Sequence, residues 1–140
     1  MKIKIKRVDK SLPLPEYHTE GSTAFDVYSR IDMIIPAKTV DRIPTNIIIE
    51  TPKGYMAQIK GRSSTPKKKN LWVDVGYIDQ DYCGETDEIL LQVLNFTNED
   101  VRVEKGERLG QIAFVRVDTV EFEEVEKMND ESRGGFGSTG

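Results

Sequence analysis

The sequence predicts an all-β barrel or sandwich with at most one short helix, and three observations support this. Short runs rich in β-branched and aromatic residues recur along the 140-residue chain. Proline and glycine separate these runs at short, regular intervals. No stretch has the apolar periodicity of a helix of useful length. Strands at this spacing are typical of barrels and sandwiches.

The first half of the chain supplies six expected strands. Charged and apolar residues alternate over residues 2–8, which is the pattern of a half-buried strand. Pro13 and Pro15 then prevent a regular ladder from continuing. The further expected strands cover residues 24–29, 33–35, 39–43, 46–50 and 55–60.

The second half predicts three more strands and a different C-terminal end. Residues 89–95 form a strongly apolar run, and residues 112–117 and 120–125 are expected to close the folded part. From Lys127 the chain becomes polar and glycine-rich, so ordering it loses much entropy and buries little surface. We therefore expect a β domain over residues 1–126 and a flexible C-terminal arm over residues 127–140.

Composition limits the function classes. The net charge is −4, which disfavours nucleic acid as a partner, and no apolar run is long enough for a signal peptide or a membrane span. The single cysteine, Cys83, excludes an internal disulfide, and the single histidine, His18, lies too far away in sequence to suggest a Cys–His nucleophile. We expect a cytoplasmic protein, or one of the host cytoplasm if the gene is viral, that binds neither nucleic acid nor membrane.

An acidic stretch at residues 76–85 is the strongest candidate for chemistry. Asp79 and Asp81 are spaced i and i+2, so an extended strand places both carboxylates on one face. One carboxylate can take a proton from water while the second tunes it or helps to hold a cation. The ring of Tyr82 is suited to packing against a sugar or a base. Taken alone, the stretch is explained more simply as an acidic hairpin with ordinary turn residues.

Three further stretches carry polar groups suited to phosphate. Arg62, Ser63 and Ser64 offer a guanidinium and hydroxyls just before three lysines, although a solvated loop explains them equally well. Asp26 lies between apolar neighbours and is either an exposed charge or a polar residue turned into a site. Gln111 can hold a water or a phosphate oxygen, or simply begin a strand.

The glycine-rich C-terminal stretch contains residues that a linker does not need. Arg133, Phe136, Ser138 and Thr139 can supply a cation, an aromatic lid and phosphate-binding hydroxyls. A linker explains the glycines but not these four residues together.

Taken in order, five motifs resemble those of the homotrimeric dUTPase family. The resemblance covers nearly the whole chain with sensible spacing. It implies a jelly-roll-like β fold, a threefold trimer and active sites between subunits that a C-terminal arm closes. The motifs are Ala24-Phe25-Asp26-Val27-Tyr28, Arg62-Ser63-Ser64, Gly76-Tyr77-Ile78-Asp79-Gln80-Asp81-Tyr82-Cys83-Gly84-Glu85, Gly106-Glu107-Arg108-Leu109-Gly110-Gln111 and Arg133-Gly134-Gly135-Phe136-Gly137-Ser138-Thr139-Gly140.

The resemblance implies Mg²⁺-dependent hydrolysis of dUTP to dUMP and pyrophosphate, which limits uracil in DNA and supplies dUMP for thymidylate synthesis. Asp79 would activate the water that attacks the α-phosphorus, and Tyr82 would pack on the deoxyribose and exclude a 2′-hydroxyl. Asp26 and Asp81 would support the site. The main ligands of the Mg²⁺ ion would be substrate phosphates and water, and Asp26 would contact the ion through a water. The other implied substrate contacts are Arg62, Ser63, Ser64, Gly76, Ile78, Gln111, Arg133, Phe136, Gly137, Ser138 and Thr139.

The sequence departs from the family pattern at several positions, among them Ser64, where glycine is common, and Tyr77, which is bulkier than the usual aliphatic residue. Arg133 lies three residues before Phe136 instead of the usual five, so its contact with the terminal phosphate depends on a flexible arm. Residues 85–88 add acids beside the site, which would bulge the next strand or bind a second cation.

Three other functions compete with hydrolysis. A dCTP deaminase of the same fold needs a glutamate where Gln92 stands, and an amide cannot act as a general base. A nucleotide sensor without turnover would need neither Asp79 nor the C-terminal motif. A purely structural trimer would leave the glycine-rich tail unexplained.

Overall fold

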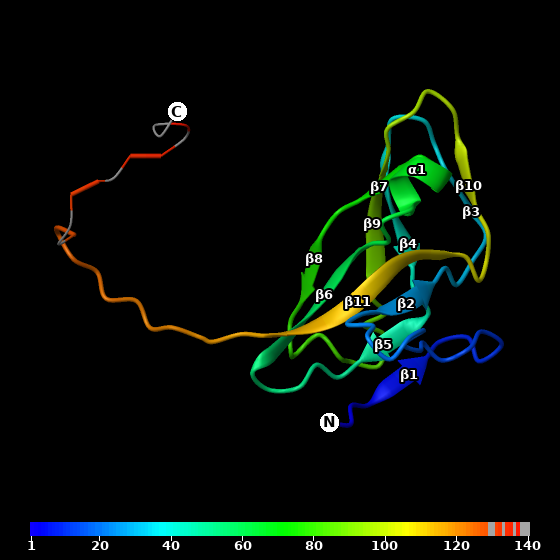
Figure 1. Ribbon diagram of the computed structural model, residues 1–140. Helices are drawn as coiled ribbons and strands as arrows, with labels where there is room; N and C mark the ends of the chain where they lie inside the picture. Colours follow the sequence, from blue (N-terminus) through cyan, green and yellow to red (C-terminus); the bar gives the residue numbers. More distant parts are fainter. Residues whose placement is uncertain (129–130, 133, 136, 138–140) are drawn as a thin grey trace.

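The computed structural model describes residues 1–128, 131–132, 134–135 and 137, and short strands form nearly all of their regular structure (Figure 1). One short helix is present in these residues, as the sequence predicts. The elements in chain order are β1 (Ile5–Arg7), β2 (Phe25–Tyr28), β3 (Met33–Ile35), β4 (Val40–Pro44), β5 (Ile47–Ile49), β6 (Tyr55–Gly61), α1 (Thr65–Lys69), β7 (Leu71–Val73), β8 (Gly76–Ile78), β9 (Leu90–Asn95), β10 (Val101–Val103) and β11 (Arg108–Arg116).

The strands form four antiparallel sheets. The largest has the order β2-β11-β6-β8, so β2 and β8 lie at its opposite edges. A second sheet has the order β4-β9-β7, and the two-stranded sheets are β1-β5 and β10-β3. Neighbours in these sheets are mostly far apart in sequence, which is typical of an all-β, jelly-roll-like fold.

The core consists mainly of aliphatic side chains from the inner faces of the sheets. In β9 the side chains alternate, because Leu91, Val93 and Asn95 are buried whereas Leu90 and Leu94 are exposed. This period of two places successive side chains on opposite faces of the strand. The outer face of the β4-β9-β7 sheet therefore keeps apolar side chains in solvent.

Helix α1 has clear start and stop signals. Pro66 lies in its first turn, and Asn70 ends it with a left-handed φ of 56°. The hydroxyl of Thr65 is buried and donates to the carbonyl of Leu109, 2.8 Å away. This bond fixes the preceding Arg62–Ser64 segment against the start of β11.

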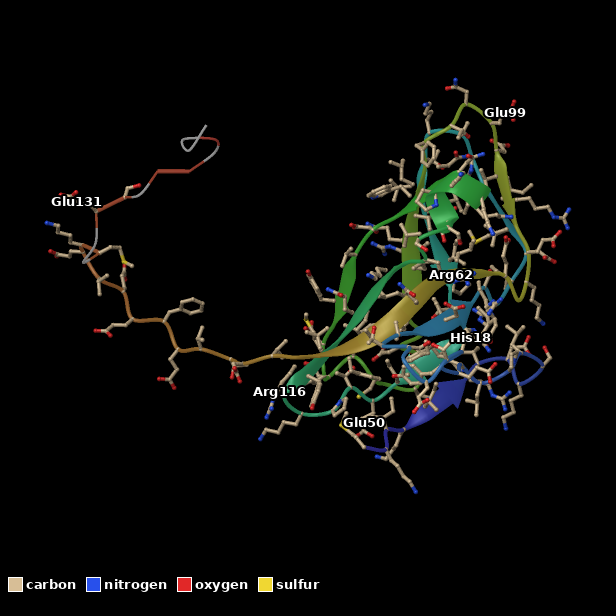
Figure 2. The ribbon with its side chains drawn as sticks, viewed as in Figure 1. His18, Glu50, Arg62, Glu99, Arg116 and Glu131 are labelled. Carbon is tan, nitrogen blue, oxygen red and sulfur yellow. The ribbon has the colours of Figure 1, made fainter. Side chains whose placement is uncertain are left out.

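The expected strand at residues 120–125 is absent. Strand β11 ends at Arg116, and the amide of Val117 still donates to the carbonyl of Gly54 at 3.0 Å. Beyond it the described tail runs away from the body with Phe122 almost fully exposed (Figures 1 and 2). A strand needs a partner for its backbone groups, and within the described chain this segment has none. The domain boundary after residue 126 stays a prediction.

A helix able to cross a membrane would have to be both long and apolar. None occurs in the ranges that the structure describes.

Candidate active site

A cavity of about 260 Å³ lies between β8, with the loop that follows it, and the outer face of β9. Three predicted substrate contacts, Gly76, Ile78 and Tyr82, share it. Its size is near the lower end for small-molecule sites. The lining residues are Arg42, Ile59, Asp74, Gly76, Ile78, Tyr82, Leu90 and Gln92.

Gly76 brings the backbone of β8 close to the floor of this cavity. A Cβ at this position would lie 2.9 Å from the Cγ2 atom of Ile59, which pairs with Gly76 across the strands. Glycine avoids that overlap and leaves the backbone accessible. Strand β8 thus offers peptide groups to a ligand instead of a side chain.

Tyr82 is fixed at one side of the cavity. Its hydroxyl donates to the carbonyl of Glu88 at 3.2 Å, and its amide approaches the carbonyl of Asp79 at 3.4 Å. Tyr82 remains 40% exposed, so part of the residue is accessible to a ligand. The turn brings the backbone of Asp79 next to that of Tyr82.

Asp79 and Asp81 are both exposed on the loop after β8. Within the described residues, neither carboxylate has a hydrogen-bond partner. Asp79 is therefore accessible to a ligand or a water at the edge of the cavity.

Gln92 lines the cavity, and its amide is fixed by hydrogen bonds. Its Oε1 accepts from Nε of Arg42 at 3.3 Å, and its Nε2 donates to Asp74 at 3.1 Å. The side chain is thus held in place by two partners. An amide cannot shuttle protons as a carboxylate does.

A second cluster surrounds Asp26, whose side chain is only 9% exposed. Its Oδ1 lies 3.2 Å from Nε of Arg62, and its Oδ2 lies 3.3 Å from Nη1 of Arg108. The sequence is compatible with Asp26 as either an exposed charge or a site residue, and the structure shows a buried carboxylate paired with two guanidiniums. Two guanidiniums against one carboxylate leave an excess positive charge, which suits an anionic ligand.

Arg108 reaches this cluster through a β-bulge. Arg108 pairs with Tyr28 whereas Gly110 pairs with Val27, so the register shifts between the two residues of β11. Bulges re-aim side chains and are frequent next to active sites. No sequence pattern marks the bulge, so the sequence alone does not single out Arg108 as a site residue.

Gln111 lies in the same row as Asp26. It pairs directly with Asp26 on one side and with Lys60 on the other, so the three residues share one face of the sheet. Ser63 is exposed and Ser64 is partly exposed on the segment after Arg62. The structure thus brings together the predicted phosphate contacts that lie in its described residues.

His18 is the second residue that sequence reasoning missed. Its Nε2 lies 2.7 Å from Nη1 of Arg108 and 3.3 Å from Oδ2 of Asp26. His18 and Arg62 both lie in the body of the fold beside β2 and β11 (Figure 2). Ninety residues separate His18 from Arg108, so local sequence carries no signal for the contact.

The two clusters are far apart within one chain. Ile78, next to Asp79, pairs with Ala57, and Arg62 directly follows β6, five residues beyond Ala57. At ~3.3 Å per residue, this separates Asp79 from Arg62 by about 17 Å or more. The described chain therefore holds two half-sites, one built around the cavity and one around Asp26.

The acids at residues 85–88 have structural partners. Glu88 forms an ion pair with Arg30, and Glu85 forms one with Lys6. Strand β9 pairs with β4 in continuous register, so the acids do not bulge it. Within the described ranges, no three His, Cys, Asp or Glu side chains gather as a metal site.

Part of the last motif lies outside the described residues. This applies to the predicted substrate contacts Arg133, Phe136, Ser138 and Thr139. Gly137 is described, and its φ of 90° lies in the left-handed region that favours glycine.

Comparison with known proteins places this arrangement in a family. The dUTPase family model matches residues 10–140, which is nearly the whole chain. The chain belongs to the dUTPase family. The deoxyuridine 5′-triphosphate nucleotidohydrolase of Dictyoglomus turgidum is 38% identical over 148 residues, covering 100% of this chain and 99% of its own. The Finegoldia magna protein of the same name is 39% identical over 145 residues and covers 99% of each chain.

Solved dUTPase structures share the fold. The Staphylococcus bacteriophage 80alpha dUTPase, solved with dUpNHpp, matches with a TM-score of 0.88 at 23% identity and covers 99% of this chain and 98% of its own. A variant of the phage phi11 dUTPase, described with a structural Mg(II) ion, matches with a TM-score of 0.82 at 18% identity over 91% of this chain and 98% of its own. The predicted all-β, jelly-roll-like dUTPase fold is confirmed.

Proposed function

We propose that this chain hydrolyses dUTP to dUMP and pyrophosphate, and thereby limits uracil in DNA and supplies dUMP for thymidylate synthesis. The observation that carries the proposal is the pair of half-sites. One offers a cavity with Tyr82 and an accessible Asp79 at its edge. The other offers two guanidiniums around a buried Asp26. Full-length relatives named deoxyuridine 5′-triphosphate nucleotidohydrolase support the same activity.

The nucleoside occupies the cavity in this proposal. Peptide groups of β8 around Gly76 and Ile78 face the uracil, and the ring of Tyr82 covers the deoxyribose. A ring packed on the sugar leaves no room for a 2′-hydroxyl, so ribonucleotides are excluded by shape. The fixed amide of Gln92 supports hydrolysis over deamination, because it offers no general base inside the cavity.

Asp79 acts as the general base. Its carboxylate takes a proton from a water, whose oxygen attacks the α-phosphorus. The bond from this phosphorus to the oxygen that bridges to the β-phosphorus breaks, and pyrophosphate leaves with the bonding electrons. Phosphoryl transfer asks the protein mainly for positioning and for neutralisation of charge.

The triphosphate lies over the Asp26 half-site. Arg62 and Gln111 contact phosphate oxygens, together with the hydroxyls of Ser63 and Ser64. Ser138 and Thr139 bind the terminal phosphate with Arg133, and Phe136 covers the uracil. These four residues belong to the last of the five family motifs, which lies on the proposed C-terminal arm.

Magnesium is the proposed cofactor, held mainly by substrate phosphates and water. Oδ2 of Asp26 is buried and accepts no hydrogen bond from the described residues, so a metal-bound water can use it. Such an ion neutralises phosphate charge and orients the triphosphate.

The proposed assembly is a homotrimer with active sites between subunits. The half-sites are too far apart in one chain to act on one phosphate group, so a second copy must complete each site. The outer face of the β4-β9-β7 sheet carries Val40, Leu94 and Trp72 opposite one another, all exposed. Exposed apolar patches of this kind mark association surfaces. The same face borders the nucleoside cavity.

Pyrophosphate release with Mg²⁺ from dUTP, dCTP, dTTP and UTP, each supplied separately, tests the activity. Selective release from dUTP supports the proposal. Ammonia released from dCTP would indicate the deaminase, and dUTP binding without any release would indicate a sensor. The cytoplasm is the proposed location, checked by fractionating cells that produce the protein.

Subunit complementation tests the shared sites. Asp79→Asn and Arg62→Ala are each expected to inactivate a homotrimer. Unfolding and refolding the two variants together forms mixed trimers. If each site takes Asp79 and Arg62 from different subunits, about a quarter of the sites in an equal mixture regain both residues. A mixture that stays inactive while light scattering shows trimers contradicts this arrangement.

A further inference from the structure

His18 makes the shortest contact in the Asp26 half-site. Its Nε2 lies 2.7 Å from Nη1 of Arg108, whereas the ion pairs of Asp26 with Arg108 and Arg62 span 3.3 Å and 3.2 Å. None of the five family motifs contains this histidine. Its contact therefore needs an explanation beyond the phosphate contacts already proposed.

The contact defines the role of the Nε2 atom of His18. Arginine has donors but no acceptor, so Nη1 of Arg108 donates and Nε2 of His18 accepts. The other ring nitrogen, Nδ1, lies 3.7 Å from a carboxylate oxygen of Glu16. His18 acts here as a hydrogen-bond acceptor for Arg108.

This acceptor competes with Asp26 for Arg108. A guanidinium beside a carboxylate prefers two parallel hydrogen bonds at 2.7–2.9 Å. Here Arg108 stands 3.3 Å from Oδ2 of Asp26, and that oxygen accepts no hydrogen bond from the described residues. The bond to His18 thus holds Arg108 away from a full pairing with Asp26.

The chain around His18 keeps the ring in place. Tyr17 packs edge-on against Phe25, with the ring centroids 5.6 Å apart, just before Asp26. On the other side, Thr19 and Ser22 close a turn through an amide-to-carbonyl bond of 3.0 Å and a hydroxyl contact of 2.8 Å. His18 is therefore fixed from both sides although the ring is partly exposed.

We propose that His18 is a positioning residue of the triphosphate half-site. It holds the guanidinium of Arg108 in one orientation, which prevents both a full pairing with Asp26 and a rotation into solvent. The remaining N–H groups of Arg108 then face the substrate phosphates. The inference rests on the proposed function, since it names a further residue for the same substrate. His18 acts through Arg108 and touches no reacting atom.

His18→Phe and His18→Gln separate the acceptor from the ring. Phenylalanine keeps the bulk but accepts no hydrogen bond, whereas the glutamine carbonyl replaces Nε2. We expect His18→Phe to raise the KM for dUTP and the Kd for dUpNHpp by about three- to tenfold, the worth of one net hydrogen bond, with kcat nearly unchanged. His18→Gln is expected to restore most of the loss. Glu20→Gln, two residues away on the same loop, is the matched control and is expected to leave both constants unchanged.

A double-mutant cycle with Arg108→Gln tests the route of the effect. If His18 works through Arg108, then His18→Phe has no further effect on the Kd in the Arg108→Gln background. An unchanged Kd for His18→Phe alone, or equal losses for His18→Phe and His18→Gln in folded trimers, overturns the proposal. Calorimetric titration with dUpNHpp needs no turnover. An inactive wild-type protein therefore counts against the proposed hydrolysis, while the variants still decide the role of His18.

Discussion

Arg30 and Glu88 form a two-point ion pair that anchors the loop bearing Asp79 and Tyr82. Nε of Arg30 lies 2.9 Å from Oε1 of Glu88, and Nη2 lies 2.9 Å from Oε2. The hydrogen bond to Glu88 raises the pKa of Arg30 above its ordinary value. Oε1 also accepts the amide of Asn46 at 2.7 Å. The carbonyl of Glu88 accepts a hydrogen bond from the hydroxyl of Tyr82, so Glu88 belongs to the ion pair and also contacts the candidate site.

Glu88→Gln is expected to lower the free energy of unfolding by about 1.5–3 kcal/mol, because it removes charge-assisted hydrogen bonds from a mostly buried pair. Urea unfolding measures the loss. Glu85→Gln is the matched control, since it removes the same charge from an exposed pair with Lys6, and its loss is expected at about 0–1 kcal/mol. Equal losses for the two variants would remove the anchoring role from Arg30 and Glu88.

Asp79→Asn is expected to reduce the rate of pyrophosphate release from dUTP by about 10²- to 10⁴-fold, the usual contribution of a general base. The Kd for dUpNHpp should change little, because the amide keeps the shape of the side chain. Asp81→Asn changes the neighbouring exposed acid and is expected to lose less activity. Turnover that survives Asp79→Asn would assign the base to another residue.

Tyr82→Ala is expected to raise the activity on UTP relative to dUTP, because the ring no longer blocks a 2′-hydroxyl. Tyr82→Phe keeps the ring and loses only the hydroxyl bond to Glu88, so discrimination should persist with a loss of about 0.5–1.5 kcal/mol in stability. Specificity constants for the two nucleotides measure the effect. Unchanged discrimination in Tyr82→Ala would show that another group reads the sugar.

Most of the fold followed from alternation and turn residues. Strand β6 lies between Gly54 and Gly61, and β9 is a strongly apolar run, so the positions of both could be predicted. Strand β10 was not predicted, because three residues carry too little periodicity to identify a strand. The prediction for residues 120–125 was wrong because alternation shows only that a segment can pair, not that a partner exists in the same chain.

The sequence could likewise predict only part of the candidate site. Gly76, Ile78 and Tyr82 belong to one short stretch, so the sequence could group them before the structure placed them around one cavity. His18 and Arg108 meet across 90 residues and through a bulge, which no local pattern encodes. The burial of Asp26 likewise depends on how neighbouring strands pair.

Gly61→Ala is expected to lower the free energy of unfolding by about 1–3 kcal/mol through overpacking. A Cβ at Gly61 would lie 2.8 Å from the Cβ of Val73, which is rigidly attached to the backbone of β7 and cannot rotate away. Gly21→Ala is the control, because a Cβ there meets nothing within 4 Å. Urea unfolding compares the two, and equal stability of both variants would show that β6 and β7 can shift apart freely.

Asp9→Asn is expected to destabilise the fold at neutral pH and to matter less in acid. Nζ of Lys105 lies 2.6 Å from Oδ2 of Asp9, and the amide of Ser11 donates to Oδ1 at 2.8 Å. These bonds, with Lys105 the largest cause, hold the pKa of Asp9 well below its ordinary range.

A lowered folded-state pKa stabilises the protein above the unfolded-state pKa, near pH 4, and the contribution disappears as the pH falls towards the folded value. Urea midpoints of the wild type and Asp9→Asn should therefore converge below about pH 4. Asp118→Asn, on the exposed tail, should have the same urea midpoint as the wild type at every pH. If the difference in urea midpoint between the wild type and Asp9→Asn stays constant at acidic pH, Asp9 stabilises the fold without its charge.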